Sequence, residues 1–389
     1  MNIVADTNIP FVQAAFGHLG ELKLLTTHEI NSDTIQEADI LLVRSETKVD
    51  KALLEGSQVR FVGTATIGTD HVDLDYLNKK GIGFANAPGS NANSVAEYIL
   101  AALLALGEQR GFALKGKTLG VVGVGNIGSR VVRLAEVMGM QVLQNDPPLA
   151  RATGDSRFLP LDDLMEADIL TLHVPLTKMG RDATFHLFDK SRLAKMKPGS
   201  ILINTSRGGV VETAALKEAL AHKTLDTCVL DVWENEPNID TELLSYVALG
   251  TPHIAGYSLD GKVRGTRMIY EAVCQYFDLP STWDAIAGLP EPRKAKILVS
   301  DDSTDMENVI RNVVKQCYDI EQDDKNLRVL LSLTDNQRPG YFERLRSEYP
   351  VRREFFNTAV LLSSNNKLLS SMLKSLGFRV GHTHGSEVK

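Results

Sequence analysis

Three side chains in the second half of the chain have types that suit the handling of a proton and an anion: Arg207, Glu236 and His253. An arginine presents a planar fork of N–H donors that fits a carboxylate. A histidine exchanges protons near neutral pH, and a carboxylate beside it favours its protonated form. Together they could hold the carboxylate of a 2-hydroxy acid and take the proton from its hydroxyl group.

Each of the three also has a simpler explanation. Arg207 could be a surface ion-pair partner, and a histidine that follows a proline, as His253 does, is often structural. Glu236 could be a solvated loop charge, which is what we expect of Glu234. Spacing alone does not bring the three together, so the elements that carry them have to be found first.

Residues 117–147 predict the element that a redox cofactor requires. The apolar run 119–122 leads into GVGNIG at 123–128, which is followed by a helical pattern, a second apolar run at 141–143 and Asp146. Strand, glycine turn, helix, strand and acid in this order are typical of a dinucleotide-binding βαβ unit. The segment therefore predicts a nicotinamide dinucleotide as cofactor.

Each glycine of this turn has its own physical reason. Gly123 permits the tight turn, Gly125 lets a pyrophosphate approach the backbone, and Gly128 lets the helix lie close to the strand. The free N–H groups and positive end of the helix then face the anion. Asp146 would accept hydrogen bonds from the ribose hydroxyls, and its charge would repel a 2′-phosphate, which favours NAD over NADP.

Short apolar runs alternate with helical patterns along the chain, which predicts parallel sheets covered by helices. We expect an α/β protein with two doubly wound, Rossmann-like domains and a small C-terminal α/β domain for dimerisation. Residues 1–92 and 258–285 would form the substrate domain and residues 93–257 the NAD domain. Residues 286–380 would form the C-terminal domain, and residues 381–389 a disordered tail.

Two long helices, at 91–111 and 261–277, would connect the first two domains. In the C-terminal domain we expect strands and helices to alternate. The expected strands are 297–299, 329–331 and 359–362, and the expected helices are 306–317, 339–349 and 367–376.

Polar residues follow two of the expected strands in the first domain, at 44–47 and 64–69. Ligands of such sheets bind beyond the carboxyl ends of the strands. Arg44, Ser45 and Thr66 are therefore candidates for binding an anionic group of the substrate. Ordinary turn chemistry explains these residues equally well.

The bulk composition excludes several classes of function. The 389-residue chain has a net charge of −7, which argues against nucleic acid or an anionic membrane as its main partner. No apolar run reaches the ~20 residues that span a bilayer, and the first residues lack a signal peptide. Cys228, Cys274 and Cys317 form no disulfide framework or zinc pattern. We expect a cytoplasmic protein without a metal; His382 and His384 would be a weak metal pair at best.

Four segments, in a fixed order over residues 1–280, resemble the signatures of the D-isomer-specific 2-hydroxyacid dehydrogenases. They are the glycine turn at 123–128, SRGG at 206–209, DVWENEP at 231–237 and TPHIAG at 251–256. In that family the matching arginine, glutamate and histidine are catalytic. The resemblance therefore implies that Arg207, Glu236 and His253 form one catalytic set.

The resemblance also implies contacts to the ligands. Ser45 and Thr66 would touch the substrate, and Tyr257 would close on it. Contacts to NAD are implied for Gly123, Gly125, Asn126, Ile127, Gly128, Asp146, Val174, Ser206, Arg207, Asp231 and Gly256. The turn departs from many relatives at Asn126 and Ile127, which changes a pyrophosphate contact and leaves the glycines intact.

A closer similarity, at 253–258, 261–266 and 349–355, points to a branch of the family that acts on a phosphorylated 2-hydroxy acid as a homodimer. Arg352 or Arg353 could then reach a phosphate across the dimer interface, or could simply form salt bridges within its own domain. Two alternatives stay open at this point. The substrate could be 3-phosphoglycerate or another D-2-hydroxy acid, or the protein could sense the dinucleotide without turning it over.

Overall fold

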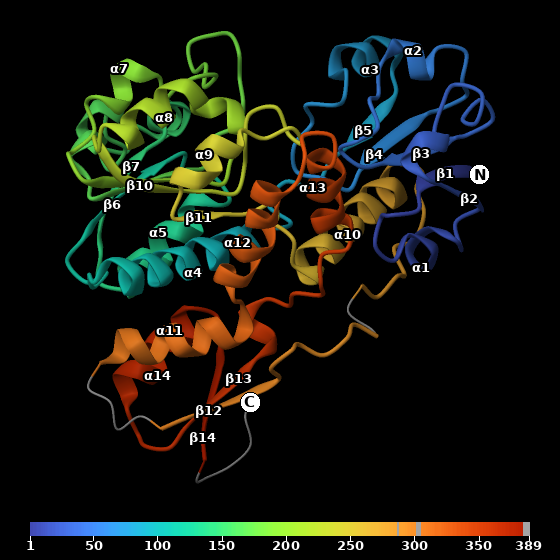
Figure 1. The fold of residues 1–389 in the computed structure, drawn as a ribbon. Coiled ribbons are helices and arrows are strands. Elements are labelled where there is room, and N and C mark those ends of the chain that lie inside the picture. Colours follow the sequence, from blue (N-terminus) through green and yellow to red (C-terminus); the bar gives the residue numbers. More distant parts are fainter. Residues whose placement is uncertain (286–287, 301–304, 384–389) are drawn as a thin grey trace. The chain divides into compact units, whose positions relative to one another are not determined.

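The structure is a computed structural model of the chain and describes residues 1–285, 288–300 and 305–383. The chain forms two compact units. Unit 1 comprises Met1–Asn91 and Ser258–Pro290, and unit 2 comprises Ala92–Tyr257 and Glu291–Lys389. Both units contain parallel sheets covered by helices, as the alternation of apolar runs predicts (Figure 1).

Unit 1 is built on a five-stranded parallel sheet with the order β2-β1-β3-β4-β5. Its strands are β1 (Asn2–Asp6), β2 (Glu21–Leu25), β3 (Ile40–Val43), β4 (Phe61–Thr64) and β5 (Gly83–Ala85), and its helices are α1 (Val12–Phe16), α2 (Lys51–Leu54), α3 (Leu74–Lys80) and α10 (Leu259–Tyr276). The sequence did not predict β2, because this edge strand alternates charged and partly exposed residues. Helix α10, the expected helix at 261–277, packs on the sheet, since a Cβ atom added to Gly63 would lie 2.5 Å from Ile269.

The sheet of the dinucleotide unit has the order β11-β10-β9-β8-β6-β7, and all its pairs are parallel. The strands are β6 (Thr118–Val122), β7 (Gln141–Asn145), β8 (Ile169–Leu172), β9 (Ser200–Asn204), β10 (Leu225–Leu230) and β11 (Leu249–Gly250). The helices are α4 (Ala92–Arg110), α5 (Gly128–Val137), α6 (Pro147–Thr153), α7 (Lys190–Leu193), α8 (Thr213–Ala221) and α9 (Thr241–Tyr246). The strand order reverses between β6 and β8, and a ligand crevice is expected beyond the carboxyl ends of these two strands.

The C-terminal segment of unit 2 adds a three-stranded parallel sheet, β12-β13-β14. Its strands are β12 (Lys296–Val299), β13 (Ala359–Leu362) and β14 (Arg379–His382), and its helices are α11 (Met306–Cys317), α12 (Ile320–Arg328), α13 (Arg338–Ser347) and α14 (Lys367–Ser375). The apolar core of this segment is continuous with that of α4, where Leu100 and Leu103 share one cluster with Ile310 and Leu369.

Two expectations for the C-terminal segment were wrong. The apolar run at 329–331 is not a strand but part of a short 3-10 helix, Val329–Ser332, that continues α12. A short apolar run fits a strand and a buried helical turn equally well, and here Leu327 and Leu330 are buried on one face. The expected disorder from residue 381 onward does not hold for Gly381 and His382, which end β14. The rest of the expected tail, 384–389, with His384 of the weak metal pair, lies outside the described residues.

In the described ranges, no helix is both long enough and apolar enough to cross a membrane. The same ranges contain no group of three or more His, Cys, Asp or Glu side chains that could hold a metal ion.

Candidate active site

Glu236 and His253 are in direct contact. The Nδ1 atom of His253 lies 2.7 Å from Oε2 of Glu236, and the backbone N–H of Trp233 donates to Oε1 of the same carboxylate at 2.8 Å. The side chain of His253 is 34% exposed and that of Glu236 is 19% exposed. Because Glu236 occupies Nδ1, the Nε2 atom is the one placed to exchange a proton with a ligand.

The environment of Glu236 keeps its carboxylate charged. Burial by itself raises the pKa of Glu236, but the net shift is downward. The charge and hydrogen bond of His253, the N–H of Trp233 and the charge of Arg346 together outweigh the burial. An ionised Glu236 orients the imidazole and stabilises it when it is protonated.

The carboxylate of Asp231 holds the loop that carries His253 in place. Asp231, directly after β10, accepts the backbone N–H of Ile254 on Oδ1 at 2.8 Å and that of Ala255 on Oδ2 at 2.9 Å. It also accepts the hydroxyl of Thr251 at 2.6 Å, and its backbone carbonyl accepts the N–H of His253 at 2.7 Å. These bonds offset the left-handed backbone of His253, whose φ is +58°.

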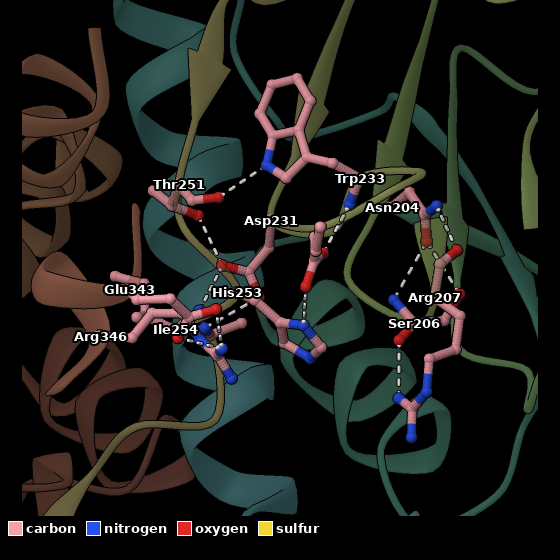
Figure 2. A network of polar contacts seen from close by, with 12 residues as sticks. Asn204, Ser206, Arg207, Asp231, Trp233, Thr251, His253, Ile254, Glu343 and Arg346 are labelled. Atoms are coloured by element: carbon pink, nitrogen blue, oxygen red, sulfur yellow. Dashed lines mark hydrogen bonds and ion pairs between the residues drawn. The ribbon is translucent and has the colours of Figure 1, made fainter. Parts of the chain in front are cut away.

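The loop of Arg207 is organised by Asn204, the last residue of β9. Its buried side chain accepts the N–H and the hydroxyl of Ser206, at 3.0 and 2.8 Å, and donates to the carbonyl of Arg207 at 3.0 Å. Gly208 lets this loop lie against the Glu236 loop, because a Cβ atom there would overlap the backbone of Trp233. The structure thus joins Glu236 directly to His253, and Figure 2 shows the loop of Arg207 beside His253.

Glu234 is not the solvated loop charge that we expected. Its Oε1 atom pairs with Nε2 of His186 at 2.8 Å, and its Oε2 atom accepts the N–H of Thr213, the first residue of α8, at 2.8 Å. The side chain is only 22% exposed. Glu234 therefore ties two neighbouring segments together, a role that no local pattern in the sequence indicates.

The glycine turn between β6 and α5 fits a dinucleotide pyrophosphate. Gly123 has φ +87°, and a Cβ atom there would lie 2.7 Å from the carbonyl oxygen of His173. A Cβ atom on Gly128 would overlap the carbonyl oxygen of Gly123. Around Gly125, in contrast, no atom of the described chain lies within 4 Å of a Cβ position. The turn is closed where the helix must pack and open where an anion would approach.

The other predicted cofactor contacts lie around this turn. Val174 follows β8 and is 2.9 Å from a Cβ atom built on Gly123, so it lies at the point where the strand order reverses. Asp146 follows β7, where its carboxylate accepts the N–H of Val124 at 2.9 Å and caps α6 by accepting the N–H of Leu149 at 3.0 Å. Ile127 directly precedes α5, and the carbonyl of Asn126 accepts a bond from Arg130. Gly256 follows the segment that Asp231 clamps.

The predicted substrate residues are distributed over both units. Arg44 and Ser45 follow β3 in unit 1, half-buried and exposed respectively. Thr66 follows β4, and its hydroxyl bonds Thr64 and the carbonyl of Gly68. Tyr257 belongs to unit 2, four residues beyond His253.

The side chain of Arg352 is buried within its own unit. Its guanidinium donates to the hydroxyl of Ser94 and the carbonyl of Ala255 and lies 4.3 Å from the ring centroid of Tyr318. Arg353 donates to the side chain of Asn357 at 2.7 Å. Arg353 thus bonds within the expected C-terminal domain, whereas the hydrogen-bond partners of Arg352 lie in the expected NAD domain and are neutral.

Sequence analysis missed the structural functions of Asn204 and Asp231. No motif singles out Asn204, and the family resemblance implies only a contact to NAD for Asp231. A buried polar residue at the carboxyl end of an apolar strand is the signal that could have identified both, because its side chain needs partners in the loop that follows.

Comparison with known families agrees with this geometry. A model of the NAD-binding domain of D-isomer specific 2-hydroxyacid dehydrogenases matches residues 101–255. A model of a domain of unknown function matches residues 289–377, which contain α11–α14 and the strands β12 and β13 of the third sheet.

Curated relatives match over nearly the whole chain. The erythronate-4-phosphate dehydrogenase of Chromohalobacter salexigens is 46% identical over 98% of this chain and 99% of that protein. The protein of the same name from Salinibacter ruber is 47% identical over 91% of this chain and 92% of its own length.

Solved structures match about 72% of the chain. D-lactate dehydrogenase from Aquifex aeolicus, in complex with NAD and lactic acid, has a TM-score of 0.59 and 28% identity over 72% of this chain and 96% of that chain. NAD-dependent formate dehydrogenase from Staphylococcus aureus, in complex with NAD, has a TM-score of 0.60 and 27% identity over 72% and 96%.

Proposed function

The chain belongs to the D-isomer-specific 2-hydroxyacid dehydrogenases, and from that membership we propose that it oxidises 4-phospho-D-erythronate at C2 with NAD. The product is (R)-3-hydroxy-2-oxo-4-phosphobutanoate, and the reaction belongs to the biosynthesis of pyridoxal 5′-phosphate. The relatives at 42–47% identity carry the name erythronate-4-phosphate dehydrogenase, which supports this substrate over 3-phosphoglycerate.

The contact between Glu236 and His253 carries the proposal. His253 takes the proton of the C2 hydroxyl on Nε2, and Glu236 stabilises the imidazolium through Nδ1. Arg207 binds the C1 carboxylate, so that the C2–H bond is oriented for cleavage. When bound, the nicotinamide accepts the hydride that leaves C2, and the C2–O bond becomes a carbonyl.

Two features support NAD as the cofactor. The open face at Gly125 and the N–H groups at the start of α5 suit a pyrophosphate. The carboxylate of Asp146 suits ribose hydroxyls and would repel the 2′-phosphate of NADP. Comparison of kcat/KM with the two cofactors tests this, and replacement of Asp146 by Ser should reduce the preference for NAD.

The substrate is tested by measuring kcat/KM for 4-phospho-D-erythronate and 3-phosphoglycerate side by side. The proposal predicts the higher value for the four-carbon acid. A higher value for 3-phosphoglycerate would make that acid the substrate instead. If the protein turned over neither acid but still bound NADH, a dinucleotide sensor would be favoured.

We also propose that the enzyme is a cytoplasmic homodimer joined through its C-terminal domain. Apolar side chains on the surface of that region support this, because Leu298, Val351 and Leu368 are 69%, 58% and 58% exposed. Light scattering should give the mass of two chains for the parent and of one chain for Leu298→Glu. A monomeric parent would refute the dimer.

We also propose that Ser45, Thr66 and Tyr257 contact the substrate, and that Arg44 binds one of its anionic groups. Replacement of each by Ala should raise the KM for the phosphorylated acid. Unchanged KM values would remove the residue concerned from the site.

A further inference from the structure

One arginine of the C-terminal domain lies beside the catalytic pair, although no motif indicated it. Arg346 is in the last turn of α13, within the domain of unknown function. Its guanidinium carbon lies 5.9 Å from the ring centroid of Tyr257, the residue expected to close on the substrate. Its charge is also among the causes that lower the pKa of Glu236. Arg346 is therefore a neighbour of both Tyr257 and the Glu236–His253 pair.

One donor of the Arg346 guanidinium has no partner among the described residues. Its side chain is only 15% exposed, yet its Nε–H is buried and has no hydrogen-bond partner among the described residues. Its Nη1 atom pairs with Glu343, 3.1 Å away, whose own side chain is 46% exposed, and its guanidinium also hydrogen-bonds Tyr257. A buried N–H without an acceptor costs free energy of folding. An anionic ligand that accepts this hydrogen bond would recover that cost, so the unpaired N–H is what we expect of an anion-binding site.

Tyr257 packs against a second aromatic ring as well as against Arg346. The ring of Tyr257 meets that of Tyr349 edge-to-face at 5.9 Å, and the hydroxyl of Tyr349 donates to Asp323 at 2.8 Å. The end of α13 and the residues after it thus place both Arg346 and Tyr349 against the ring of Tyr257. Figure 2 shows Arg346 and Arg207 on opposite sides of His253.

This arrangement matches the charges of the proposed substrate. The acid has a carboxylate at C1, the reacting hydroxyl at C2 and a phosphate at C4, so its two anionic groups flank the reacting carbon. We propose that Arg346 binds the C4 phosphate while Arg207 binds the C1 carboxylate, which holds C2 against His253. The inference rests on the proposed function, and it makes the C-terminal domain a determinant of substrate specificity.

The test compares a substrate with and without the phosphate. For Arg346→Gln, kcat/KM for 4-phospho-D-erythronate should fall ~10- to 100-fold, mainly through KM, because a charge-assisted bond is lost. For D-erythronate, kcat/KM, or Ki if it only inhibits, should change less than ~3-fold, since no phosphate contact exists to be lost. Arg346→Lys should recover part of the affinity for the phosphorylated acid.

Two further variants complete the design. Arg344 is exposed on the same helix, over the ring of Tyr341, so Arg344→Gln is the matched control and should change neither substrate more than ~3-fold. Glu343→Gln removes the carboxylate that competes for Arg346 and should lower the KM for the phosphorylated acid alone. This variant keeps the test decisive if Arg346→Gln fails to fold.

Each outcome has one meaning. Equal losses with both substrates, or a shifted pH profile with both, would show that Arg346 only supports Glu236 and would overturn the proposal. Unchanged KM values in Arg346→Gln, or in Glu343→Gln if the former does not fold, would also overturn it. A parent that does not oxidise 4-phospho-D-erythronate would instead refute the proposed function.

Discussion

The Nδ1 atom of His253 lies 2.7 Å from Oε2 of Glu236, and a backbone N–H fixes the second oxygen of the same carboxylate. A carboxylate held at both oxygens has little freedom to turn away from the imidazole. This single contact fixes the orientation of His253 and decides which nitrogen is available for proton exchange.

Replacement of Glu236 by Gln should lower kcat ~100- to 10,000-fold. The amide cannot stabilise the imidazolium, and an amide N–H pointed at Nδ1 would select the wrong tautomer. Steady-state kinetics with 4-phospho-D-erythronate measures the loss, and NADH binding should stay within ~3-fold of the parent.

Glu234→Gln is the matched control for this variant, because Glu234 lies two residues away and bonds His186 and Thr213 instead. It should keep kcat within ~3-fold of the parent. Equal losses in both variants would mean that the loop, and not the contact to His253, is what matters.

Replacement of Asp231 by Asn should destabilise the protein and lower kcat together. Asp231 accepts two N–H groups and a hydroxyl, and an amide leaves at least one buried donor unsatisfied, at a cost of ~1–3 kcal/mol. Denaturant unfolding and kinetics measure both effects. Asp226→Asn is the control, since Asp226 on the same strand is half-exposed and pairs with Arg110. A variant of Asp231 with the stability of the parent would contradict this account of the loop.

Replacement of Gly125 by Ala should weaken NADH binding ~10-fold or more and leave the fold intact. A Cβ atom there meets nothing in the described chain, but it would stand where the pyrophosphate approaches. Fluorescence titration with NADH gives the affinity, and thermal unfolding gives the stability. Gly340→Ala, which is equally open and lies on α13, should leave NADH affinity unchanged and can only raise the stability slightly, because alanine favours a helix over glycine. Normal NADH affinity in the Gly125 variant would place the cofactor elsewhere.

Burial raises the pKa of Asp323 to about 6, against an ordinary value of 3.8, and the hydrogen bond from Tyr349 and the charge of Arg352 offset it only in part. Between about pH 4 and 6 the folded protein therefore binds more protons than the unfolded chain, so this group makes stability fall as pH rises through that window. Asp323→Asn lacks this dependence. Its free energy of unfolding, minus that of the parent, should rise by ~1–3 kcal/mol from pH 4 to 7. A difference that stays flat or falls would show that Asp323 does not titrate in this way.

The sequence was sufficient to predict elements whose signal is local. The glycine turn, the strand–helix alternation and the motifs around Arg207, Glu236 and His253 all predict parallel α/β sheets and a dehydrogenase site, because each depends on short-range spacing. The parallel sheets and the helices α4, α10 and α11 confirm the predicted fold.

Long-range contacts were beyond sequence reasoning. The role of Glu234 depends on His186, and the burial of Arg352 depends on Ser94 and Ala255. The proposed role of Arg346 likewise depends on its contact with Tyr257, which lies 89 residues earlier in the chain. No periodicity or motif encodes such contacts, since they arise when distant elements pack together.

The most direct measurement is the rate of NADH formation from 4-phospho-D-erythronate by the parent and by His253→Gln, at saturating NAD. Glutamine keeps the size and polarity of the side chain but cannot take up the hydroxyl proton, so kcat should fall ~1,000-fold or more while NADH affinity stays unchanged. A variant that forms NADH at the rate of the parent would contradict the assignment of His253 as the proton acceptor.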